Sequence, residues 1–195
     1  MLNEVKEIYS EMRNCGIGNK FMGEVYNYPQ PGLFLGSRIL FIAQNPGKPR
    51  PEENPSDKIL MNLNSTDEEH HSAYEKSQKN WLFYKKFIRP IIGDSQDFSI
   101  MNIVFYPTIS NTYPSADLLR ECVPYVGRLI KLINPRVIVA VGSLSATEVG
   151  VINFKLQNKY RLFGCKHYSH LLRGSSSLLR WEIEKIKGEL EVLDE

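Results

Sequence analysis

Three short groups of polar residues have side chains suited to binding and polarising a ligand. Gln44 and Asn45 directly follow an apolar run and precede a Pro-Gly pair. Asn102 lies in a second apolar segment, and His167 and His170 lie in a third polar stretch. A primary amide offers one hydrogen-bond donor and one acceptor, and an imidazole N–H can donate to a developing negative charge. Chemistry at these residues requires a fold that brings the three groups together.

Apolar strands that alternate with helical patterns predict such a fold. Short apolar runs bounded by turn formers predict strands at residues 38–43, 99–105, 136–141 and 160–164. Apolar residues at helical spacing predict helices at 1–14, 67–92 (ending near Arg89-Pro90), 115–133 with Ser115 as N-cap, 145–151 and 177–191. We therefore expect a three-layer α/β/α domain with a central, mostly parallel four-stranded sheet. Such sheets bind ligands at the carboxyl ends of their strands, where all three polar groups would lie.

Length, charge and cysteine content restrict the class of protein. A chain of 195 residues predicts a single domain over 1–195. The net charge of +2 neither requires nor excludes a nucleic-acid partner, and local basic clusters are more often solvated surface. The three cysteines form no CxxC pair, which argues against a disulfide framework and fits a cytoplasmic protein. No signal peptide and no membrane-spanning run is evident.

Several segments, in order along most of the chain, resemble motifs of the uracil-DNA glycosylase superfamily. Ala-Gln-Asn-Pro-Gly at 43–47 lies between the GQDPY of the main enzymes and the GINPG of the mismatch-specific branch. Met-Asn-Ile-Val at 101–104 is similar to the TN(V/I)V segment of the iron–sulfur branch. Residues 121–126 and 133–142 resemble that branch's ECRPFL and I-P-VIVALG segments, and 167–170 stands at the HPSP or HPSA position.

The chain departs from the iron–sulfur branch at the cluster ligands. That branch uses four cysteines, and Cys15 and Cys122 stand at two of the matching positions. Gly18 and Tyr106 occupy the other two positions. Because two thiolates cannot replace four ligands, we expect no iron–sulfur cluster. No residue spacing in the chain demands a metal site, so we also expect no metal and no other cofactor.

Two further departures concern the loops of the expected site. The segment after the first motif is replaced by residues 52–57, so the usual stacking phenylalanine is not evident there. Tyr168 and His170 replace the prolines of the HPSP-like motif, and His170 is a rival to His167 for its role. Trp81, Phe83, Tyr84 and Phe87 are expected mostly in the core, although one of them, or Tyr26 or Tyr106, can stack on a base.

The resemblance implies roles for individual residues. Asn45 would position the attacking water, and His167 would stabilise the leaving base as negative charge develops on it. Asn102 would read one edge of a uracil-like base through its amide. The remaining residues expected around the base are Gln44, Ala43, Pro46 and Gly47. Without the resemblance, turn formation is the favoured interpretation of Gln44 and Asn45, because Asn before Pro-Gly is common turn chemistry.

A second group is expected to bind DNA. Apolar wedges and basic side chains support a flipped nucleotide. The residues implied are Ser143, Ser169, Leu171, Leu172 and Arg173. Two plainer alternatives stay open: that Leu171 and Leu172 pack under their loop, and that Ser143 or Ser145 caps a helix.

The function that these observations predict is that of a monomeric, monofunctional DNA glycosylase for base excision repair. It would excise uracil or a related deaminated base from DNA, in the cytoplasm or at the nucleoid. One alternative is a glycosylase for hypoxanthine or mismatched thymine. The others are a catalytically weak DNA-binding module of the same fold and a nucleotide-binding α/β protein without glycosidic chemistry.

Overall fold

A parallel four-stranded sheet forms the centre of the molecule, with the strand order β2-β1-β3-β4. The computed structural model describes residues 2–14, 36–44, 82–95, 97–105, 113–167, 170, 173–174 and 176–192. The strands are β1 (Ile39–Ala43), β2 (Phe98–Asn102), β3 (Val137–Val141) and β4 (Arg161–Cys165). All three strand pairings are parallel, as predicted.

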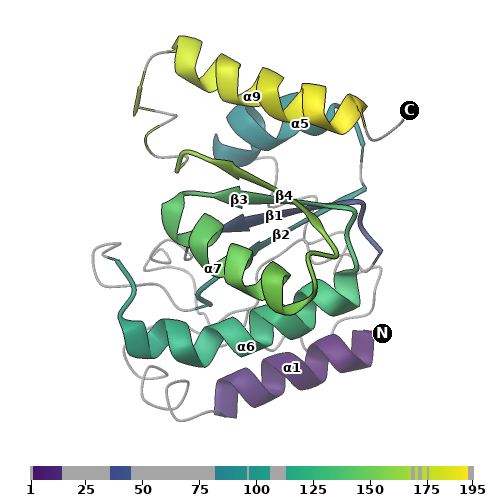
Figure 1. Ribbon diagram of the computed structural model, residues 1–195, viewed down its shortest axis with the longest axis vertical. Helices are drawn as coiled ribbons and strands as arrows, with labels where there is room; N and C mark the ends of the chain where they lie inside the picture. The colour runs from purple at the N-terminus through teal and green to yellow at the C-terminus, as the bar shows by residue number, and fades with distance from the viewer. Residues whose placement is uncertain are drawn as a thin grey trace, which may run out of the picture.

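Helices cover both faces of this sheet (Figure 1). One face carries α1 (Leu2–Asn14), α6 (Ala116–Ile133) and α7 (Ser143–Lys155). The other carries η1 (Tyr84–Ile88), a π-helical turn, with α5 (Arg89–Ile92) and α9 (Ser176–Glu191). The three-layer α/β architecture expected from the sequence is confirmed.

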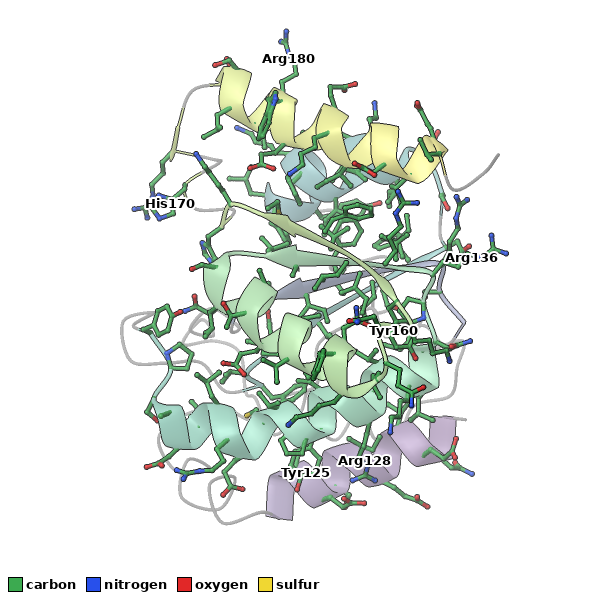
Figure 2. The ribbon with its side chains drawn as sticks, in the orientation of Figure 1. Tyr125, Arg128, Arg136, Tyr160, His170 and Arg180 are labelled. Atoms are coloured by element: carbon green, nitrogen blue, oxygen red, sulfur yellow. The ribbon has the colours of Figure 1, made fainter. Side chains whose placement is uncertain are left out.

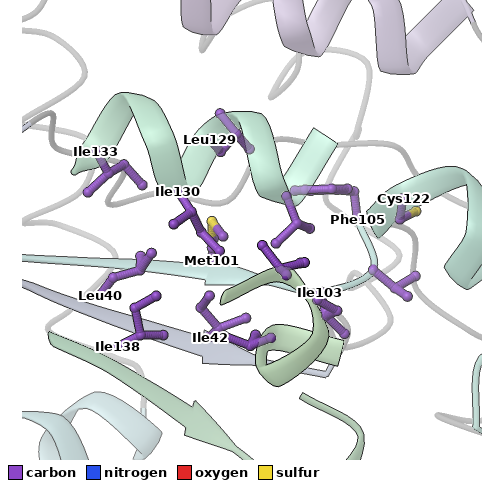
Figure 3. Close-up of a cluster of buried hydrophobic side chains, with 14 of the residues drawn as sticks. Leu40, Ile42, Met101, Ile103, Phe105, Cys122, Leu129, Ile130, Ile133 and Ile138 are labelled. Atoms are coloured by element: carbon purple, nitrogen blue, oxygen red, sulfur yellow. The ribbon is translucent and has the colours of Figure 1, made fainter. Parts of the chain in front are cut away.

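Alternation along β1 explains why this strand is apolar throughout. Leu40 and Ile42 of β1 face the helix layer formed by α1, α6 and α7, where Figure 3 shows them among side chains of α6 and β2. Ile39, Phe41 and Ala43 face the opposite layer. Successive side chains of a strand point to opposite faces, so a strand covered on both sides needs apolar residues at every position.

The end of β2 differs from the prediction in a way that affects the site. The predicted strand ran to residue 105, but β2 ends at Asn102. The N–H groups of Ile103 and Val104 donate to the consecutive carbonyls of Ala43 and Gln44, at 2.8 and 3.0 Å. Because a parallel ladder does not pair consecutive groups in this way, the chain leaves the sheet here and Asn102 is its last strand residue.

Most helix boundaries follow local signals, but α7 spans Ser143–Lys155, longer at both ends than the predicted 145–151. Ser115 caps α6 by accepting the Leu118 N–H at 3.2 Å, and Asn134 ends that helix in the left-handed conformation with φ +50°. The predicted helix over 67–92 ends as expected at Ile92, although Arg89-Pro90 does not itself stop the helix. The preceding π turn lets Arg89 N–H bond to the Tyr84 carbonyl, and Pro90 then occupies the first turn of α5, where its missing N–H is tolerated. Residues 67–81 of that prediction lie outside the described residues.

No helix in the described part of the chain is long and apolar enough to span a bilayer.

Candidate active site at the carboxyl ends of the strands

The strand register brings the predicted polar groups to one edge of the sheet. Ala43, the last residue of β1, is paired with Asn102, the last residue of β2. Val141 at the end of β3 is paired with Cys165 at the end of β4. The residues that follow these strands, Gln44, Gly142 and Lys166, therefore leave the sheet at the same edge.

The junction after β1 and β2 is held by main-chain hydrogen bonds. The carbonyls of Ala43 and Gln44 accept the N–H groups of Ile103 and Val104 described above. The Asn102 side chain is buried beside this junction, with 5% of the residue exposed, and Gln44 is partly buried. Because the main-chain carbonyl of Gln44 already accepts the Val104 N–H, the side-chain amide of Gln44 is the better candidate for contact with a ligand.

Gly142 provides the surface on which His167 lies. Its N–H donates to the Cys165 carbonyl at 2.9 Å, and its φ is +96°, a conformation that favours glycine. A Cβ at this position would lie 3.2 Å from His167 Cδ2 and 3.3 Å from His167 Cβ. The missing side chain of Gly142 therefore lets the histidine pack directly against the turn between β3 and α7.

Burial at this position changes the acid–base behaviour of His167. The residue is half-buried, and burial, with a smaller contribution from the nearby His170, lowers the pKa of His167 below its ordinary value. Desolvation disfavours the charged form of an imidazole, so the ring is neutral at pH 7. A neutral ring keeps one N–H that can donate a hydrogen bond.

His170 lies in a different environment from His167. Its N–H donates to the His167 carbonyl at 2.9 Å, and its own carbonyl accepts the Gly174 N–H at 2.8 Å. His170 is exposed and lies at the outer edge of the molecule (Figure 2). Packing against the sheet edge therefore favours His167 over its rival as the functional histidine.

Cys165 is poorly suited to act as a nucleophile with His167. It is buried with 8% of the residue exposed, and burial, followed by the negative charge of Glu182, raises the pKa of its thiol to about 12. A thiol with this pKa stays protonated at neutral pH, whereas nucleophilic attack requires the thiolate.

Glu182 was not identified from the sequence as part of this region. It lies on α9, only 4% exposed, and its Oε1 accepts the Lys166 N–H at 3.4 Å. A signal was available, because Glu182 stands four residues before the buried Ile186 and next to the buried Ile183. A glutamate on the apolar face of an amphipathic helix is unusual.

The remaining predicted residues divide into two groups. Ser143 is the exposed first residue of α7, and Arg173 is also exposed. Gly142 occupies the N-cap position of α7, so the alternative that Ser143 or Ser145 caps this helix is wrong. The predicted residues that lie outside the described part of the chain are Asn45, Pro46, Gly47, Ser169, Leu171 and Leu172.

The structure reduces the number of aromatic residues that can stack on a base. Phe83 and Phe87 are 1% and 0% exposed in the core, where their rings stack at 5.3 Å. Tyr84 stacks on Phe98 at 6.0 Å. Trp81, Tyr26 and Tyr106 lie outside the described residues.

The cysteines do not fit the four-thiolate cluster of the iron–sulfur branch. Cys122 is 2% exposed within the hydrophobic cluster of α1, α6 and α7 (Figure 3). Cys15 lies outside the described residues, and Gly18 and Tyr106 have no thiol. Among the described residues, no group of three or more His, Cys, Asp or Glu side chains is arranged to hold a metal ion.

Comparison with known proteins identifies the family. The family model described as the uracil DNA glycosylase superfamily matches residues 32–191, which include all four strands and the turns that follow them. A comparison with curated protein sequences gave no significant match. The match is to the superfamily as a whole, so the branch stays a prediction. Since the matched region covers most of the chain, the protein belongs to the uracil DNA glycosylase superfamily.

Proposed function

We propose that this protein removes uracil, or a related deaminated base, from DNA by hydrolysing the N-glycosidic bond. Membership in the superfamily indicates a DNA glycosylase that acts on damaged bases. The observation that carries the finer proposal is the half-buried, neutral His167, packed on Gly142 at the sheet edge where Asn102 ends β2. We propose that the enzyme is monofunctional and monomeric and uses no metal or cluster.

The reaction requires stabilisation of charge on both sides of the breaking bond. The sugar develops oxocarbenium character, and the base leaves as an anion. His167 donates its N–H to the base oxygen as negative charge grows there. Because the ring is neutral before reaction, it provides this donor without a buried positive charge.

Asn102 and Asn45 complete the proposed chemistry. The Asn102 amide meets both an acceptor and a donor on one edge of a uracil-like base, and its burial at the end of β2 supports this role. Asn45 orients the attacking water through its amide oxygen. Gln44, with Ala43, Pro46 and Gly47, surrounds the base.

The contacts with DNA are proposed at the same edge. Arg173 and the hydroxyls of Ser143 and Ser169 bind phosphates. Leu171 and Leu172 occupy the space left when the damaged nucleotide is flipped out of the helix. Both described members of this group, Ser143 and Arg173, are exposed, as phosphate contacts require.

An excision assay tests the proposal. The protein is incubated with single- and double-stranded oligonucleotides that carry uracil, hypoxanthine, xanthine or mismatched thymine, and abasic sites are then cleaved with alkali. We expect strand scission with uracil. Scission only with hypoxanthine or thymine would assign a different base, and DNA binding without scission would identify a binding module.

Three substitutions test the assigned residues. Asn45→Ala and His167→Ala should each lower the excision rate by about ten- to a hundred-fold, because each removes a positioned group that acts in the transition state. His170→Ala is the matched control and should change the rate by less than about twofold, within the range of an exposed surface substitution. Near-normal rates in both Asn45→Ala and His167→Ala would refute the assigned site.

A further inference from the structure

We propose that Glu182 is a positioning residue for His167, whose imidazole it aligns by holding the main chain at Lys166. The inference rests on the proposed function, in which His167 contacts the leaving base. Glu182 belongs to α9, a helix to which the sequence assigned no role in the site. Its carboxyl group reaches from the helix layer to the residue that immediately precedes His167.

The first observation is the burial of a carboxylate on an otherwise apolar face. The other buried residues of α9 are Ile183, Ile186 and Leu190. Glu182 is as buried as these residues, and in the described part of the chain its Oε2 has no hydrogen-bond partner. Burying an incompletely satisfied carboxylate destabilises the fold, and an aliphatic side chain would pack there without that cost. Such departures from an apolar helix face are expected at residues that support a functional site.

The second observation is the target of the carboxylate. Oε1 accepts the Lys166 N–H at 3.4 Å, a long hydrogen bond, and this N–H lies just beyond the end of β4. No ladder pairing extends to Lys166, because the β3–β4 register ends at Val141 and Cys165. The hydrogen bond from Glu182 therefore restrains Lys166, the first main-chain residue after the last strand pairing.

The third observation is that each residue of the segment 165–167 contacts either Gly142 or Glu182. The Cys165 carbonyl accepts the Gly142 N–H, the Lys166 N–H donates to Glu182, and the His167 ring rests on Gly142. These contacts come from two sides, the turn before α7 and the helix α9. Misplacing a catalytic group by about 1 Å can lower the reaction rate about a hundred-fold. Loss of either restraint on His167 should therefore lower the excision rate.

Substitutions at Glu182 test the inference. Glu182→Met keeps the length of the side chain but removes the strong acceptor, and it should lower the single-turnover excision rate by about ten-fold or more. Glu182→Gln keeps an acceptor oxygen and should stay within about threefold of the wild type. Glu184→Met is the matched control on the same helix: Glu184 is exposed, and its substitution should leave the rate unchanged. Affinity for undamaged DNA should change by less than about twofold in all three variants.

A double-mutant cycle separates positioning from a general structural effect. If Glu182 acts through His167, Glu182→Met should change the residual rate by less than about twofold in the His167→Ala background. A full additional loss in that background, or a wild-type rate in Glu182→Met alone, would overturn the inference. If Glu182→Met does not fold, Glu182→Leu takes its place in the cycle.

A spectroscopic readout keeps this inference separate from the proposed function. The ring resonances of His167, assigned by their loss in His167→Ala, should shift in Glu182→Met and stay in place in Glu184→Met. Unchanged resonances in Glu182→Met would refute the positioning role even in an active enzyme. Failure of the wild-type protein to excise any base would refute the proposed function and leave this measurement to decide the placement of the ring.

Discussion

Contact between His167 and Gly142 depends on the absence of a single side chain. Gly142 combines a positive φ with an imidazole so close that a Cβ would meet it at 3.2 Å. The sequence predicted a role for His167, whereas Gly142 entered only as the last residue of the segment 133–142 that resembles a family motif. The positive φ of Gly142 and its contact with a residue 25 positions later arise only in the folded backbone. The pattern Val-Gly-Ser alone therefore could not reveal them.

We predict that Gly142→Ala lowers the excision rate by about ten-fold or more. The new methyl group would lie 3.2 Å from His167 Cδ2, so the histidine must shift by a few tenths of an ångström, and a shifted donor stabilises the leaving base less well. The measurement is the single-turnover rate at saturating enzyme.

Gly93→Ala is the matched control for this prediction. Gly93 has a φ of +65° and nothing within 4 Å of the position of an added Cβ. Both variants should lose stability by about 1–3 kcal/mol, because each glycine has a positive φ in a region that other residues rarely adopt. Only Gly142→Ala should lose rate, and equal rates in the two variants would show that the contact with His167 has no role in catalysis.

At the scale of helices and strands, the elements with strong local signals were predictable. All four strands lie within two residues of their predicted starts, since apolar runs flanked by turn formers determine where a buried strand begins. The end of β2 was not predictable, because Ile103 and Val104 are as apolar as the strand and leave it only through their bonds to Ala43 and Gln44. The place of Glu182 among the apolar residues of α9 was a signal in the sequence, but its hydrogen bond to Lys166 forms only when α9 packs beside the end of β4.

The N-cap of α6 gives a prediction at this scale. Ser115→Ala removes the acceptor for the Leu118 N–H and should lower the free energy of unfolding by about 1 kcal/mol. Chemical denaturation measures this value. The excision rate should not change, because Ser115 lies at the start of a helix that the proposed chemistry does not use.

Thr147→Ala provides the comparison for Ser115→Ala. Thr147 is exposed within α7 and does not occupy a capping position. Its substitution should change the free energy of unfolding by less than about 0.5 kcal/mol. A similar loss in both variants would mean that the Ser115 hydrogen bond contributes nothing beyond an ordinary surface substitution.

For DNA binding by the whole molecule, the location of the positive charges matters more than the net charge. The net charge of +2 is too small to indicate a DNA-binding face by itself. The parallel sheet gives the molecule two distinct edges. His167 and the exposed Arg173 follow β4 at the carboxyl edge, and Arg136 precedes β3 at the amino edge. Figure 2 shows Arg136 on the opposite side of the molecule from His170, which lies between His167 and Arg173 in the sequence. The proposed function assigns phosphate contacts only to the carboxyl edge.

Salt dependence of DNA binding distinguishes these two edges. Each phosphate contact releases condensed counterions, so the logarithm of affinity should fall linearly with the logarithm of salt concentration. Arg173→Ala should weaken binding to undamaged duplex and reduce the magnitude of this slope by about one. Arg136→Ala removes the same charge from an exposed residue at the opposite edge and should leave the slope unchanged. Equal slopes for the two variants would place the phosphate contacts elsewhere, because only a charge that lies on the bound DNA changes the number of counterions released.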